Sequence, residues 1–197
     1  MSRMRIVAPV MVFSLCLVSF AMTAAEAPEN LAPNPSFENG IPPKVSDWSF
    51  WLWAPKGEKC SSACVWDDKV AHSGTRSLKI RGTEPRQVGV WDNYHGGGLI
   101  PVVTGKTYCV SVWVRTQMLP QEGMLRISVG FLDQPGSYLQ EGAVTHNPIL
   151  TGENDWTRVA FTVKAPEKAR FARLDLMFTG IGSVWFDDAA FVVDLNA

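Results

Sequence analysis

The chain has 197 residues, with 18 basic and 19 acidic side chains and a formal net charge of −1. This length fits one domain of ordinary size once a leader segment is removed. The near-neutral charge, without a polybasic block, argues against a nucleic-acid partner bound through its phosphates and against attraction to an anionic membrane surface.

The first segment, residues 1–25, has the three parts of a secretion signal. Met1–Arg5 is basic, Ile6–Phe20 is apolar, and Ala21–Ala25 supplies small residues for cleavage. The apolar run contains a proline and is shorter than a typical membrane span, so a transmembrane anchor is the less favoured alternative. We therefore expect an exported protein, secreted or periplasmic, whose mature chain is a single domain over residues 26–197.

After the signal, Asn30–Glu38 reads Asn-Leu-Ala-Pro-Asn-Pro-Ser-Phe-Glu. Pro33 and Pro35 exclude a helix interior and favour extended or turn geometry. Asn39-Gly40 then predicts a turn. The segment is thus expected to form a short strand and a turn that carry one carboxylate, Glu38.

Two cysteines, Cys60 and Cys64, are separated by Ser-Ser-Ala. In an oxidising compartment they can close a small disulfide loop, which is the favoured interpretation. Free thiols and a metal site are the alternatives, but a metal site needs more ligands and only His72 is near in sequence. Cys109 lies in an apolar strand pattern and is expected to be a buried free thiol.

Period-two patterns recur from Ser77 to the end of the chain, and long helical periods do not. Turn residues such as those of Gln134-Pro-Gly136 separate the runs. One face of each run is apolar, as shown by Tyr108, Val110, Val112 and Val114; by Leu125, Ile127, Val129 and Phe131; by Val159, Phe161 and Val163; and by Ala172, Leu174, Leu176 and Phe178. Many short strands with one apolar face predict an all-β fold, a two-sheet β-sandwich.

Six segments follow one another in a recognisable order: Asn30–Glu38, Asp47-Trp48, Ala71–Lys79, Pro101–Tyr108 with Ser111–Trp113, Asp155–Val159 and Val184–Asp188. In this order they resemble the CenC-type carbohydrate-binding modules, of the family 4/9/22 kind. The resemblance covers essentially the whole mature chain. It implies a β-jelly roll of the galactose-binding-domain-like type, and it implies an exported, stand-alone carbohydrate-binding protein.

In the resembled modules a structural calcium ties the first strand to the last, and the matching positions here are Glu38, Asp187 and Asp188. Calcium takes six to eight oxygen ligands, which two carboxylates and backbone carbonyls can supply. Adjacent acids on a strand point to opposite faces, so we expect only one of Asp187 and Asp188 to bind through its side chain. The alternative is that these acids are solvated strand-end residues.

All eight tryptophans follow the predicted signal. A flat aromatic ring can stack on the apolar C–H face of a sugar. Because the ring is rigid, it loses little conformational entropy when it is held in place. Trp48, Trp156 and Trp185 are expected to pack in the core. The candidate ligand-binding residues are Trp51, Trp53, Trp91, Asn93, Tyr94, His95, Trp113, Arg115, Arg126, Tyr138 and Gln140.

Trp113 alternates with core-facing valines and therefore faces outward, as do Arg126, Ser128, Arg173 and Asp175 in their own strands. If all five lined one concave sheet, the cleft would be polar with a cationic element. Such a cleft would suit a uronate-bearing glycan as well as a neutral one. A solvated outer face is the alternative.

The sequence thus predicts recognition of a polysaccharide or oligosaccharide, of the β-glucan or xylan kind, through outward aromatic side chains. One alternative is a hydrolase or lyase that acts on glycosyl bonds. No catalytic residue is assigned, because the acids are scattered and the three histidines lie in separate loops. The second alternative is a structural or adhesive envelope protein.

Overall fold

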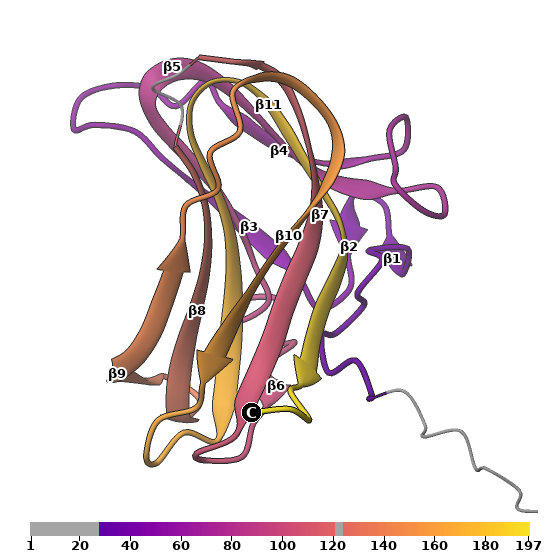
Figure 1. The fold of residues 1–197 in the computed structure, drawn as a ribbon. Coiled ribbons are helices and arrows are strands. Elements are labelled where there is room, and N and C mark those ends of the chain that lie inside the picture. Colours follow the sequence, from indigo (N-terminus) through magenta and orange to yellow (C-terminus); the bar gives the residue numbers. More distant parts are fainter. Residues whose placement is uncertain (1–27, 121–123) are drawn as a thin grey trace, which may run out of the picture.

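A computed structural model describes residues 28–120 and 124–197, and these residues form an all-β domain (Figure 1). The predicted secretion signal lies outside the described residues. Within the described residues, no helix is long and apolar enough to cross a membrane.

The described residues form eleven strands. In chain order these are β1 (Gly40–Ile41), β2 (Lys44–Val45), β3 (Ser49–Trp53), β4 (Ala63–Asp67), β5 (Ser77–Asp92), β6 (Ile100–Pro101), β7 (Thr107–Leu119), β8 (Met124–Gln134), β9 (Ser137–His146), β10 (Gly152–Lys164) and β11 (Phe171–Val193).

Most of these strands pack as two antiparallel layers, and β5 and β11 run through both (Figure 1). The short strand β6 pairs with the start of β11, and β1 and β2 form a separate two-stranded sheet. Sheet I has the order β9-β8-β11-β5-β3, and sheet II has the order β10-β7-β11-β5-β4. Residues 171–179 of β11 pair with β8, whereas its residues 183–193 pair with β7. The predicted β-sandwich is therefore confirmed, and its layers share two long strands.

Glycines allow β5 and β11 to pass from one layer to the other. A Cβ on Gly82 would lie 1.8 Å from the carbonyl oxygen of Gly180. Gly180 and Gly182 have φ values of 127° and 125°, which residues with a side chain rarely adopt. The register between β11 and β5 also shifts at this point. The close approach of the two paired backbones at this point thus depends on the absence of side chains.

The core between the layers consists of the apolar faces that the alternation predicts. Val112, Ile127 and Leu176, from three different strands, are each 0% exposed. Trp48 and Trp185 are buried, as expected. Trp156 is only half-buried, so the expectation of a core position for it is wrong.

The predicted disulfide is absent, because both cysteines are free thiols. Cys60 Sγ lies 3.5 Å from the side-chain oxygen of Gln87, and Cys64 Sγ lies 4.0 Å from the carbonyl oxygen of Val90. Burial raises the pKa of the Cys64 thiol to about 12, which disfavours its reactive thiolate. Cys109 is also free, but it is half-buried where full burial was expected.

Candidate functional site

The outward side of sheet I carries side chains in rows that cross the strands. One row, set by the strand register, contains Trp51, Val90, Met177 and Arg126. The neighbouring row contains Ser49, Asp92, Asp175, Ser128 and Thr145. Together with Trp53, Tyr138, Gln140 and Arg173, we call these side chains the hollowed face.

Two hollows lie on this face, side by side over β8 and β9. The first, of about 570 Å³, is lined by residues that include Met124, Arg126, Ile149 and Met177. The second, of about 480 Å³, is lined by residues that include Tyr138, Gln140, Arg173 and Asp175. Ser128 and Thr145 line both. The hollows thus adjoin each other at these two side chains, and we refer to them together as the depression; its walls are both polar and apolar.

Aromatic rings stand at both edges of the hollowed face. Trp51 and Trp53 project from the edge strand β3 and are 39% and 51% exposed. Tyr138 projects from the opposite edge strand, β9, and is 42% exposed. Its ring lies 5.4 Å from that of Tyr94, measured between centroids. Flat surfaces that a sugar ring can stack on therefore stand at both edges of the hollowed face.

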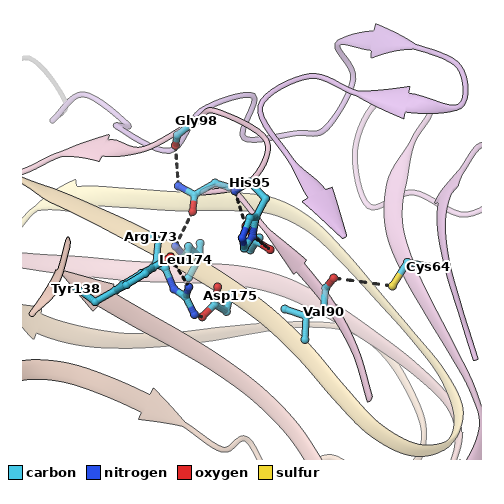
Figure 2. Close-up of polar contacts among 10 residues, drawn as sticks. Cys64, Val90, His95, Gly98, Tyr138, Arg173, Leu174 and Asp175 are labelled. Carbon is cyan, nitrogen blue, oxygen red and sulfur yellow. Dashed lines mark hydrogen bonds and ion pairs between the residues drawn. The ribbon is translucent and has the colours of Figure 1, made fainter. Parts of the chain in front are cut away.

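A polar network forms the floor between these edges (Figure 2). Arg173 donates hydrogen bonds to Asp175 Oδ2 at 2.6 Å and to the Tyr138 hydroxyl at 3.2 Å. Asp92 accepts hydrogen bonds from the His95 backbone nitrogen, at 2.7 Å, and from its ring, at 3.0 Å. These hydrogen bonds fix the orientations of Tyr138 and His95, the side chains that stand at the rim.

Asp92 and Asp175 are direct partners across β5 and β11. Burial raises the pKa of Asp175 to about 6; Arg173 opposes this rise, and the charge of Asp92 adds to it. Oδ1 of Asp175 is buried without a hydrogen-bond partner among the described residues. The Asp92 and Asp175 side chains are 1% and 7% exposed. A ligand would therefore contact the side chains that they hold, His95 and Arg173, and not the two carboxyl groups themselves.

The hollowed face brings together five of the residues expected to bind a ligand, with two more at its rim. Trp51, Trp53, Arg126, Tyr138 and Gln140 belong to the face itself. Tyr94 and His95 reach the rim through their contacts with Tyr138 and Asp92. The sequence missed the pairing of Asp92 with Asp175, because only the strand register shows it.

Two candidates turn out to be structural. Trp91 faces the core at 2% exposed, and its ring nitrogen donates to the Lys79 carbonyl oxygen. Asn93 is fully buried; its amide donates to the Gly98 carbonyl oxygen and accepts from the Leu174 backbone nitrogen (Figure 2). Asn93 therefore joins the loop after β5 to β11, and neither residue is placed to contact a ligand.

Trp113 and Arg115 lie on β7, in sheet II, on the other side of the sandwich. Their outward orientation is as predicted, but the conjecture that Trp113 shares a sheet with Arg126 is wrong. The Trp113 ring stacks on His72 with centroids 4.0 Å apart, and Trp156 meets His72 edge-on. The exposed platform expected at Trp113 is thus covered by a histidine.

The three predicted metal ligands meet at one turn, residues 72–76, from two ends of the chain. Glu38 Oε1 accepts hydrogen bonds from the backbone nitrogens of Thr75 and Arg76, both at 2.8 Å. Asp187 Oδ2 accepts one from the His72 backbone nitrogen at 2.7 Å. We call this arrangement the turn clasp. The expected connection between the first and last segments is therefore present.

The turn clasp does not fit a calcium ion held by all three carboxylates. Asp188 Oδ2 lies 2.6 Å from the His72 ring nitrogen, and Asp188 Oδ1 accepts from the Ser73 hydroxyl at 2.7 Å. The described residues contain no group of three or more His, Cys, Asp or Glu side chains placed to hold a metal. A calcium bound by fewer carboxylates, with backbone carbonyls completing its shell, stays a prediction.

Comparison with protein-family models matches residues 29–182 to CBM_4_9, described as a carbohydrate binding domain. The match spans most of the described residues and both sheets. A comparison with curated proteins finds no significant match.

Several solved structures share the fold at low sequence identity. TmCBM61, solved in complex with β-1,4-galactotriose, is 17% identical, with a TM-score of 0.53 over 84% of this chain and 99% of that one. The CBM22-1 xylan-binding domain of Paenibacillus barcinonensis Xyn10C is 14% identical, with a TM-score of 0.52 over 88% and 100%. The enzymatically active domain of bacteriophage CBA120 tailspike protein 4 is 15% identical, with a TM-score of 0.61 over 84% of this chain but only 21% of its own. These likenesses show the jelly-roll fold.

Proposed function

The chain belongs to the CBM_4_9 family of carbohydrate-binding domains, and we propose that it binds a polysaccharide or oligosaccharide of the β-glucan or xylan kind at the hollowed face. The family supports the class of ligand, and the geometry supports the choice of this surface. The proposal commits to sheet I and not to the outer side of sheet II.

The observation that carries the proposal is the exposed pair Trp51 and Trp53. Both rings project from the same side of β3, on the same sheet face as the depression but with β5 between them and the strands that line it, and each is more than a third exposed. Alternate residues of a strand lie about 7 Å apart, so the two rings offer successive stacking surfaces to one extended ligand. Exposed rings on the same sheet face as a polar depression are typical of a binding surface.

The polar part of the depression supplies the directional contacts that stacking lacks. The hydroxyls of Ser128 and Thr145 lie 3.1 Å apart, where both hollows meet. Tyr138 is held by Arg173, which is itself held by Asp175. Hydroxyl donors and acceptors fixed in this way can bind sugar hydroxyls without first losing conformational freedom.

Affinity gel electrophoresis tests the proposal directly. The protein is run through gels that contain a soluble β-glucan, xylan or galactan, with a non-binding reference protein in the same lanes. We expect at least one glycan to retard the protein relative to the reference. A mobility that matches the reference in every gel would remove the basis of the proposal.

We also propose that the protein is exported by the segment at residues 1–25. The basic, apolar and small-residue parts of that segment support this. N-terminal sequencing of the protein recovered from the periplasm or the medium would test it, with cleavage expected after Ala25. Recovery of the uncleaved chain in the cytoplasm alone would contradict it.

A further inference from the structure

The first hollow, of about 570 Å³, combines apolar walls with a cation. Met124 and Ile149 line it and are 46% and 95% exposed. Arg126 projects from β8 into the same hollow. Its guanidinium nitrogens lie 3.1 Å from Met124 Sδ and 4.0 Å from Met177 Sδ. A hydrophobic surface and a positive charge thus meet within one depression.

Arg126 has no acidic partner among the described residues, in contrast to arginines nearby. On the same face, Arg173 is paired with Asp175 at 2.6 Å. On sheet II, Arg115 approaches Asp155 at 3.9 Å. The hydrogen-bond partners of Arg126 in the described structure are thioether sulfurs, which are weak acceptors. Among the described residues, therefore, no strong acceptor occupies its N–H donors.

The hollow is suited to an anion that arrives on a sugar. None of the described residues that line it is acidic, so among these residues no carboxylate repels an anion or competes for Arg126. A guanidinium presents a planar fork of donors that matches the two oxygens of a carboxylate. Ser128 and Thr145 line the same hollow and offer hydroxyls to the substituents of a sugar ring. The methionines of the hollow offer an apolar surface to the C–H face of that ring.

We propose that this hollow is a subsite for a uronic acid, a sugar ring that bears a carboxylate, and that Arg126 binds the carboxylate. The subsite rests on the proposed function, because the uronate is one residue of the glycan bound at the hollowed face. Trp51 and Arg126 lie in one row, three strand spacings apart. At about 4.8 Å per spacing this is about 14 Å, a span that an oligosaccharide bridges and a single ring does not.

Calorimetry with matched acidic and neutral oligosaccharides tests the subsite. The pairs are xylo-oligosaccharides with and without a glucuronic acid substituent, and oligogalacturonate with its fully methyl-esterified form. We expect the acidic member of at least one pair to bind about tenfold more tightly, as a charge-assisted contact would provide. Raising the salt from about 50 mM to about 500 mM should reduce this preference, because the pair is partly exposed.

Two variants assign the preference to Arg126. Arg126→Gln should bring the affinity for the acidic member down to that for the neutral one, whereas Arg126→Lys should retain part of the difference, because it keeps the charge without the fork. Arg115→Gln, an arginine change on the opposite sheet, is the matched control and should keep the full preference. Equal melting temperatures of the variants and the wild type would confirm that each remains folded.

Three outcomes would overturn the subsite alone. In the first, neutral glycans bind and the acidic members bind no more tightly, which leaves the proposed function intact. In the second, Arg126→Gln keeps the preference. In the third, a sulfated neutral glycan is preferred over every uronate, which would assign the hollow to a sulfate ester. An absence of binding to any glycan would overturn the proposed function and the subsite with it.

Discussion

At the residue scale, Asp175 is the most unusual group of the hollowed face. It lies almost fully buried beside a second carboxyl, Asp92, and one of its oxygens has no partner among the described residues. Its ion pair with Arg173 orients the Tyr138 hydroxyl. Asp175 thus supports the rim of the depression while its own ionised form is disfavoured by burial.

The raised pKa of Asp175 gives a prediction about stability and pH. The pKa in the folded protein is about 6, above the ordinary value of 3.8, so the native state binds this proton more tightly than the unfolded state. The contribution of Asp175 to stability is therefore largest below pH of about 4 and is lost as the pH rises to about 6. Asp175→Asn removes the titration, and its amide can still accept from Arg173.

We expect the melting temperature of Asp175→Asn to fall less than that of the wild type between pH of about 4 and about 7. Thermal denaturation in matched buffers measures this difference. The comparison with the wild type isolates Asp175 from other groups that titrate in the same range, such as Asp187. Parallel melting curves for the two proteins across this range would show that Asp175 ionises freely in the folded state.

The sequence could place Asp175 on the outward side of its strand, but not beside Asp92. Alternation within a strand is a local property, whereas the pairing of β5 with β11 joins segments about 80 residues apart in the chain. The same reason explains why the sequence could not distinguish the core-facing Trp91 from the outward Trp51. Both lie in aromatic-rich runs, but only the register shows that Trp51 faces out and that Trp91 faces the core.

At the scale of elements, the turn clasp joins the first segment and the last strand to one turn. Although partial burial opposes it, hydrogen bonds from Thr75 and Arg76 lower the pKa of Glu38, which shows that its ionised form is the one bound. The sequence resemblance predicted that Glu38 and the acidic pair of β11 share one site, and Glu38 and Asp187 do bind the same turn. It did not show that the intervening partner is the backbone of residues 72–76.

Metal removal tests the remaining calcium prediction. If one or two of the clasp carboxylates share a calcium ion with backbone carbonyls, a chelator should lower the melting temperature, and added calcium should restore it. Magnesium, which prefers a tighter octahedral shell, serves as the control and should restore less. A melting temperature that is the same with chelator and with calcium would contradict the calcium prediction and would mean that hydrogen bonds alone hold the turn clasp together.

The second feature at this scale is the place where β5 and β11 pass together from one layer to the other. Their backbones approach closely there because the sequence has glycines at the contact. Gly82→Ala would place a methyl group 1.8 Å from the Gly180 carbonyl oxygen, and the backbone there cannot yield as a side chain could. We expect this variant to lose several kcal/mol of stability, as a forced core overlap does, or to fail to fold.

Gly130→Ala is the matched control for this change. Its added Cβ would meet only the Arg173 side chain, at 3.5 Å, which is ordinary contact. Its melting temperature should therefore stay near that of the wild type, measured by circular dichroism. A Gly82→Ala protein as stable as Gly130→Ala would mean that the backbones of the two strands do not approach each other as closely as described.

At the scale of the whole molecule, the fold was largely predictable and the site only in part. The alternation of apolar and polar residues predicts both the strands and the apolar core. The full burial of Val112, Ile127 and Leu176 confirms this prediction. The assignment of strands to layers is a property of the assembled sandwich. Trp113 and Arg126 are both outward, yet they lie on opposite sheets, because their strands, β7 and β8, join different parts of β11.

The predicted disulfide failed for a similar reason. The spacing of Cys60 and Cys64 permits a small loop, but Gln87 of β5 holds the intervening residues from across the sheet. Its side-chain oxygen accepts hydrogen bonds from the backbone nitrogens of Ser61 and Ser62, at 2.9 and 3.1 Å. A contact of this range is not visible in the local sequence.

The central claim is that the hollowed face of sheet I, and not sheet II, binds the glycan. The most direct measurement is the retardation, in gels containing the best-binding glycan, of the double variant Trp51→Ala/Trp53→Ala and of Trp156→Ala. Trp156 is the matched control, a half-buried tryptophan of sheet II. With both proteins folded, we predict that the double variant loses most of its retardation and that Trp156→Ala keeps it. Full retardation of the double variant, or its loss in Trp156→Ala alone, would contradict the account.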